Sequence, residues 1–141
     1  MSKINAARTR AESSRTNLNK AFENALSILP AYMNIRWASI IDTRNMDPIY
    51  VYPEYTDVLD LMENIGSLGN LFKLQYGDLK EVDIFKINRK DGYCFICLTI
   101  SNRHALIVKL PSSPSLHPAK KMCEHVKLIL EQLLNTNNFE L

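Results

Sequence analysis

The stretch that decides the fold runs from Glu81 to Leu110 and reads EVDIFKINRKDGYCFICLTISNRHALIVKL. It predicts three successive β-strands, at Val82–Asn88, Tyr93–Ile100 and Ala105–Leu110, because β-branched and aromatic residues fill each run and polar residues separate them. Asp91-Gly92 is typical of a tight hairpin, since glycine accepts the positive φ of such turns. The middle strand is apolar on both faces, which predicts a place inside a sheet that is covered on both sides.

The rest of the chain supplies two further strands and three helices. Apolar residues recur at helical spacing over Asn17–Leu29, Val58–Gln75 and from about Pro118 to Asn135. Strands are predicted at Trp37–Asp42 and Pro48–Tyr52, and the prolines around the second strand place it at a sheet edge. We therefore expect an α+β fold with three layers (α/β/α), a five-stranded antiparallel sheet and the element order α-β-β-α-β-β-β-α.

Length and composition indicate one domain. The chain has 141 residues, 46% of them hydrophobic, and a net charge of +2, which is too small for a dedicated nucleic-acid binder. We expect residues 1–15 to form a flexible basic arm, 16–135 the folded domain and 136–141 a tail. Three cysteines without framework spacing, and no long apolar segment, predict a cytoplasmic protein, unless a partner recruits it to a membrane or the cytoskeleton.

Cysteine and histidine positions do not predict a reactive site. Cys94 and Cys97 have the C-x-x-C spacing of redox and zinc motifs, but in a strand they would lie about 10 Å apart on opposite faces. We interpret them as buried structural thiols. His104, His117 and His125 lack metal-ligand spacing and a partnered nucleophile, so we expect them on the surface.

Five carboxylates, Asp42, Asp47, Glu54, Asp57 and Asp60, gather between the first hairpin and the second helix. Such a run is able to bind a cation or act as an acid/base pair. Helix capping and a favourable charge in the first helical turn explain Asp57 and Asp60 without any ligand, and no calcium-loop spacing is present. The sequence therefore predicts no metal, no cofactor and no catalytic residue.

Two features leave alternatives open. Gly66 and Gly69 lie inside the long second helix at a cost of about 1 kcal/mol each relative to alanine. Either they permit the close approach of a neighbouring backbone or they are merely tolerated. Lys120, Lys121 and Lys127 form either a basic patch for an acidic partner or an ordinary solvated face.

The order of elements resembles the Roadblock/LC7 family, small modules of dynein light chains, lysosomal scaffolds and bacterial regulators of Ras-like polarity GTPases. The resemblance covers residues 17–135: the opening helix LNKAFENALSIL, the strands WASIIDTR and PIYVYP, the long apolar helix, the three-strand meander and the closing helix. The family's first turn often carries an Asp-x-x-Gly sequence. Here Asp42-Thr43-Arg44-Asn45 has no glycine, and Asn45 is expected to supply the positive φ.

The resemblance implies a dimer in which the third strands of two subunits pair edge to edge and the second helices pack together. Carried over to this sequence, the interface comprises four strand residues and the outer face of four helix residues: Val82, Ile84, Phe85, Ile87, Leu61, Ile65, Leu68 and Phe72. The implied function is a non-enzymatic scaffold or regulator. Its partners would be a second copy or a related subunit, together with a small Ras-like GTPase or a motor or membrane-associated complex, with no nucleic acid and no membrane insertion.

Two other functions stay open. A longin- or profilin-like subunit of a trafficking complex shares the sheet architecture, but longin domains begin with a strand whereas this chain begins with a helix at Leu18. An enzyme or ligand sensor needs a cavity lined by converging polar groups, while bulky sheet residues predict a filled interior. Arg44, Arg89 and Arg103 lie in predicted turns, and none of them is assigned as an arginine finger.

Overall fold

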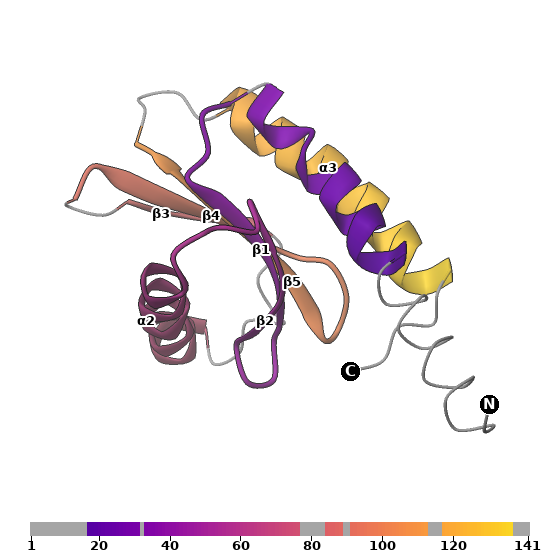
Figure 1. Ribbon diagram of the computed structural model, residues 1–141. Helices are drawn as coiled ribbons and strands as arrows, with labels where there is room; N and C mark the ends of the chain where they lie inside the picture. The colour runs from indigo at the N-terminus through magenta and orange to yellow at the C-terminus, as the bar shows by residue number, and fades with distance from the viewer. Residues whose placement is uncertain (1–16, 32, 77–83, 89–90, 113–116, 137–141) are drawn as a thin grey trace.

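The computed structural model describes residues 17–31, 33–76, 84–88, 91–112 and 117–136 (Figure 1). The first helix is described over residues 17–26 and is followed by a short 3-10 turn, η1 (Leu29–Ala31). The remaining elements, in chain order, are β1 (Trp37–Asp42), β2 (Asp47–Tyr52), α2 (Val58–Tyr76), β3 (Ile84–Asn88), β4 (Tyr93–Thr99), β5 (His104–Pro111) and α3 (His117–Thr136). In the described part of the chain no strand precedes β1, in contrast to the order that a longin domain would require.

The strands form one antiparallel sheet in the order β2-β1-β5-β4-β3. Four strands, β2-β1-β5-β4, make up its body, and the short β3 is added along β4 at one edge. β2 lies at the opposite edge, as its flanking prolines predict, and β4 lies inside the sheet, as its two apolar faces predict. The central strand is β5, because the chain returns from β4 to pair with β1.

Helices cover both faces of this sheet. Figure 1 shows α2 on one face, and the first helix and α3 side by side on the other. Residues alternate along β1, so Trp37 and Ile41 pack toward α2 while Ala38 and Ile40 pack toward the other two helices. The predicted α+β class, with an antiparallel sheet between layers of helices, is confirmed.

Two apolar cores follow from this layering. The larger core lies between the sheet and the first helix and α3; its fully buried residues include Phe22, Leu26, Ile40, Ile96, Leu106, Val126 and Leu130. The smaller core lies under α2 and contains Trp37, Ile41, Leu61, Ile65, Leu68, Phe95, Cys97, Ala105 and Ile107. With one helix over the smaller core, a large part of the α2 surface remains free for solvent or a partner.

The turn between β1 and β2 differs from the prediction. Met46, not Asn45, has the positive φ, at 61°. Asn45 instead uses its side-chain oxygen to accept the Asp47 amide at 3.0 Å, while the Met46 amide donates to the Asp42 carbonyl at 2.8 Å. These two hydrogen bonds hold the turn. The residue with the left-handed backbone conformation is therefore Met46, one position later than expected.

The Met46 side chain also explains one of the two helical glycines. A Cβ added at Gly69 would lie 2.9 Å from Met46 Cγ, whereas a Cβ at Gly66 would meet nothing within 4 Å. Gly69 therefore makes room for a side chain of the β1–β2 turn rather than for a backbone. Gly66 is tolerated at an exposed position of α2.

Candidate functional site

An exposed apolar surface lies at the start of α2. Tyr55, Val58, Leu59 and Met62 are 89%, 66%, 75% and 43% exposed, and we call these four residues the α2 patch. Tyr55 lies in the loop before α2, and the other three residues lie on its first two turns. Exposed large apolar side chains that follow one another so closely along the chain are typical of a protein-interaction surface.

The α2 patch replaces the helix residues that the sequence suggested for an interface. Leu61, Ile65 and Leu68 are at most 3% exposed, because they form the inner face of α2 and pack on the sheet. Their predicted outward orientation is therefore wrong. The sequence did not identify the exposed residues of the α2 patch, because α2 carries apolar residues on more than one side. Their spacing therefore does not show which side faces the sheet.

The other predicted interface residues lie in or near β3. Val82 is outside the described residues. The backbone of Ile84, Phe85 and Ile87 forms the β3 edge strand, which pairs with β4. The side chains of these three residues and of Phe72 are outside the described part of the chain. A strand edge of this kind is able to pair with another strand, so the interface itself stays a prediction.

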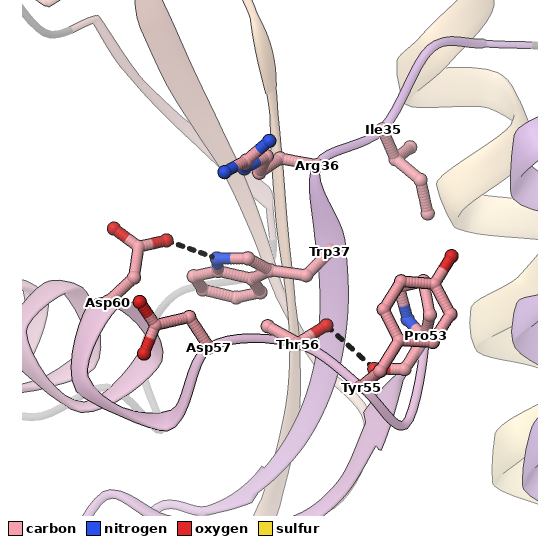
Figure 2. Close-up of a pocket in the computed structure, with 8 residues that line it drawn as sticks. All are labelled: Ile35, Arg36, Trp37, Pro53, Tyr55, Thr56, Asp57 and Asp60. Carbon is pink, nitrogen blue, oxygen red and sulfur yellow. Dashed lines mark hydrogen bonds between the residues drawn. The ribbon is translucent and has the colours of Figure 1, made fainter.

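A cleft with a volume of about 390 Å³ adjoins the α2 patch. It lies between the start of β1, the β2–α2 loop and the first turn of α2 (Figure 2), and its lining residues are Ile35, Arg36, Trp37, Pro53, Tyr55, Thr56, Asp57 and Asp60. Within the described residues, no ion pair joins Arg36 to Asp57 or to Asp60. The cleft therefore separates opposite charges.

Local hydrogen bonds fix the walls of this cleft. The Thr56 hydroxyl donates to the Pro53 carbonyl at 2.6 Å, and the Leu59 amide donates to Asp57 Oδ1 at 3.0 Å. Asp57 is thus the N-cap of α2, as the sequence predicts. On the facing wall, the Arg36 amide donates to the Lys109 carbonyl at 2.7 Å, which anchors the backbone directly before β1.

Asp60 joins the cleft to a buried polar network. The Lys109 ammonium lies 3.2 Å and 3.3 Å from Asp60 Oδ1 and Oδ2. The Trp37 indole N–H donates to Asp60 Oδ2 at 3.2 Å, and the Asn64 amide donates to Asp60 Oδ1 at 3.0 Å. Lys109 also lies 4.9 Å from the centre of the Tyr93 ring, a cation–π distance. The network ties α2 to the sheet.

The charge of Asp60 follows from these contacts. Burial by itself would raise its pKa, but the hydrogen bonds from Lys109 and Trp37 outweigh burial and lower it. The sequence had explained Asp60 as a favourable charge in the first turn of a helix. The missed signal was Lys109, the single charged residue in the apolar run of β5, because a buried lysine requires an acidic partner.

A second cleft, of about 360 Å³, shares Asp60 and Lys109 with this network. Its other lining residues are Glu63, Asn64, Ser67 and Asp91, so its walls are mainly polar. Asp91 uses its carboxylate to accept the Tyr93 amide at 3.1 Å, which closes the predicted turn before β4, and Gly92 has a φ of 87° there.

Among the predicted surface histidines, His104 is the exception. It begins β5 and is 3% exposed, with Nδ1 2.8 Å from the Ser101 hydroxyl. Burial lowers its pKa, which favours the neutral ring. It is buried because its strand begins one residue earlier than predicted. His117 and His125 are exposed on α3, as expected.

The arginines and carboxylates of the loops are mostly structural. Arg44 donates to Asp42 through Nε at 3.1 Å and through Nη2 at 2.6 Å, and its side-chain hydrogen bond lowers the pKa of Asp42 to about 2. Arg103 is half-buried, and Arg89 lies outside the described residues. Asp47 and Glu54 are exposed and lie apart from the network.

The cysteines are buried thiols, as predicted. Cys94 and Cys97 belong to opposite cores, and Cys123 is also buried. Burial raises the pKa of Cys97 far above its ordinary value and that of Cys123 to about 12, so both remain protonated. Within the described ranges, no group of three or more His, Cys, Asp or Glu side chains is arranged to hold a metal ion.

α3 carries the three lysines for which the sequence left open either a basic patch or an ordinary solvated face. Lys127 pairs with Glu131 across one turn of α3 at 3.9 Å, while Lys120 is half-buried and Lys121 exposed. This arrangement favours a solvated face over a basic patch. In the part of the chain that the structure describes, no helix has the length and apolar character needed to cross a membrane.

The fold recurs in solved structures of bacterial proteins. MglB from Myxococcus xanthus matches with a TM-score of 0.63 and 16% identity, over 84% of this chain and 90% of that one. The gliding protein MglB from Thermus thermophilus matches with a TM-score of 0.63 and 12% identity, over 84% and 92%. A Roadblock/LC7 domain from Streptomyces avermitilis matches with a TM-score of 0.55 and 16% identity, over 79% and 97%.

This chain has the Roadblock/LC7 fold. The fold resemblance suggested by the order of elements is confirmed, although no protein-family model and no curated protein matches the sequence. TM-scores of 0.55 to 0.63 show the shared fold, while identities of 12% to 16% leave the partner open.

Proposed function

We propose that this protein is a dimeric, non-enzymatic scaffold or regulatory module that binds a small Ras-like GTPase. The observation that carries the proposal is the match of nearly the whole domain to MglB and Roadblock/LC7 structures. The α2 patch supports it, because its four large apolar side chains are exposed and the core of this chain does not use them. The protein's activity would lie in presenting this surface.

The dimer interface that we propose combines two elements. The backbone edge of β3, which pairs with β4 on one side, pairs with the same strand of a second subunit and continues the sheet. Leu59 then contacts the second subunit from α2, while Tyr55 and Met62 contact the GTPase. A related subunit in place of an identical copy is compatible with the same contacts.

Light scattering after size-exclusion chromatography tests the dimer at tens of micromolar protein. We expect the mass of a dimer for the wild type and of a monomer for Leu59→Asp, because a charge in an apolar interface is costly to bury. The matched control is Leu128→Asp, which changes a leucine of α3 that is 58% exposed and outside the proposed interface. A monomeric wild type, or equal dissociation of both variants, would count against the dimer.

GTPase binding is tested separately, with small Ras-like GTPases from the same genome loaded with GDP or a non-hydrolysable GTP analogue. Surface plasmon resonance should detect nucleotide-dependent binding that Tyr55→Ala and Met62→Asp weaken and Leu128→Asp leaves unchanged. Because the proposed role is regulatory, the nucleotide state should change the affinity. Equal affinity for both nucleotide states would argue for a passive scaffold, and absence of binding would refute the GTPase role.

A further inference from the structure

The start of α2 lies in an acidic part of the chain. No lysine or arginine occurs between Arg44 and Lys73, whereas five carboxylates do: Asp47, Glu54, Asp57, Asp60 and Glu63. The chain as a whole has a net charge of +2, so this segment has the opposite sign to the rest of the protein. Within the described residues, Asp60 is the one carboxylate of the five that forms an ion pair. The other four are exposed and present their negative charge to solvent.

Helical spacing places exposed apolar and acidic side chains of α2 next to each other. Met62 lies one turn beyond Val58, and Glu63 lies one turn beyond Leu59, so that each pair is adjacent on the helix surface. All four of these residues are exposed. Glu63 also lines the cleft of about 360 Å³ that it shares with Asp91 of the turn before β4. The apolar surface of α2 therefore has an acidic border that continues onto this turn.

We propose that the exposed face of α2 binds a GTPase surface that is apolar at its centre and basic along one edge. The inference rests on the proposed GTPase role and names the chemistry of the surface that fits this face. The apolar part packs on Val58 and Met62, and a lysine or arginine of the GTPase lies in the cleft beside Glu63 and Asp91.

Charge decides which partner this face accepts. An acidic surface would be repelled by the exposed carboxylates, whereas a basic edge is attracted to them and associates faster at low salt. Asp60 takes little part, because Lys109 already neutralises it. In a dimer with a two-fold axis, α2 of the second subunit carries the same carboxylates, so that helix does not supply the basic edge. The partner of stated chemistry is therefore a different chain.

Two synthetic peptides probe the surface without any assumption about which GTPase binds. One is an amphipathic helix of leucine and lysine, and the other has glutamate in place of every lysine; both carry the same dye. Fluorescence anisotropy with the full chain should show at least about tenfold tighter binding of the leucine–lysine peptide at low salt, although the chain itself is net positive. The preference should disappear at about 1 M salt, where charges are screened within about 3 Å.

Variants assign the contacts to α2. Glu63→Gln should weaken the leucine–lysine peptide at least about threefold, and Glu63→Gln combined with Asp91→Asn at least about tenfold. Asparagine at position 91 keeps an oxygen to accept the Tyr93 amide, so the turn should still form. Met62→Ser should weaken the same peptide through lost apolar contact. The matched control is Glu124→Gln, which removes the same charge from an exposed position of α3 and should bind as the wild type does.

The proposal would be overturned if the two peptides bound equally well, or if neither bound at about 100 μM protein. Equal weakening by Glu124→Gln and Glu63→Gln would also overturn it, as would a monomeric mass for Glu63→Gln in light scattering, which would assign that carboxylate to the dimer interface. GTPase binding is a separate readout. If a GTPase binds and neither salt nor Glu63→Gln changes its affinity, the charge argument fails while the GTPase role stands; if the peptides discriminate and no GTPase binds, the GTPase role fails.

Discussion

The Asp60–Lys109 pair gives the sharpest test of how α2 is held on the sheet. The Lys109 side chain is 6% exposed and that of Asp60 is 34% exposed, so the ammonium is the deeply buried partner. Asp60→Ala leaves this ammonium beside the Tyr93 and Phe95 rings without the carboxylate that contacts it. Removing one partner of a buried ion pair costs about 3–5 kcal/mol, and the water that reaches Asp60 reduces this to about 2–3 kcal/mol.

Removing the lysine of this pair instead of the aspartate should cost much less stability. Lys109→Met keeps a long apolar side chain under α2, while Asp60 retains Trp37, Asn64 and access to water. We expect Lys109→Met to cost about 1 kcal/mol or less. The double variant Asp60→Ala/Lys109→Met should then be more stable than Asp60→Ala, because it no longer contains a buried unpaired charge.

Urea unfolding followed by circular dichroism, at one fixed protein concentration, measures all four proteins. For a chain of this length, a loss of about 2–3 kcal/mol corresponds to a fall in melting temperature of roughly 6–10 °C. If Asp60→Ala fell within about 0.5 kcal/mol of the wild type, or if the double variant were no more stable than Asp60→Ala, the network would not hold α2 as argued.

The remaining predictions concern α2, the first turn and the cysteines. Gly66→Ala should stabilise the fold by about 0.5–1 kcal/mol, and Gly69→Ala should gain less or lose stability because its Cβ would meet Met46 Cγ at 2.9 Å; urea midpoints compare the two. The pKa of Asp42 is lowered to about 2 by Arg44, so its contribution is complete above about pH 4 and is lost as the pH falls toward 2. Acid unfolding of Asp42→Asn should therefore show a shallower loss of stability over this range than the wild type, and identical profiles would contradict the assignment. The three buried cysteines should react with a thiol reagent at the rate of unfolding, and fast labelling of the native protein would show that one is accessible.

Much of the fold was predictable because its signals are local. Alternation along β1 separates Trp37 and Ile41 from Ala38 and Ile40, and the structure places these pairs in opposite cores. Asp57 was identifiable as a cap from its place before an apolar helical stripe. The positive φ of the first turn was harder to predict, because the turn has no glycine and either Asn45 or a neighbour was able to adopt it. Hydrogen bonding within the turn selected Met46.

The elements, their order and the buried face of most of them follow from local sequence patterns, since each depends on residues within a few positions of one another. The tertiary structure decided the rest. It brought Asp60 to Lys109 across 49 positions, set Arg36 opposite Asp57, and turned Leu61 inward and Leu59 outward on a helix that is apolar on both sides. Contacts between distant residues depend on how the layers pack, and one sequence without that packing does not specify them.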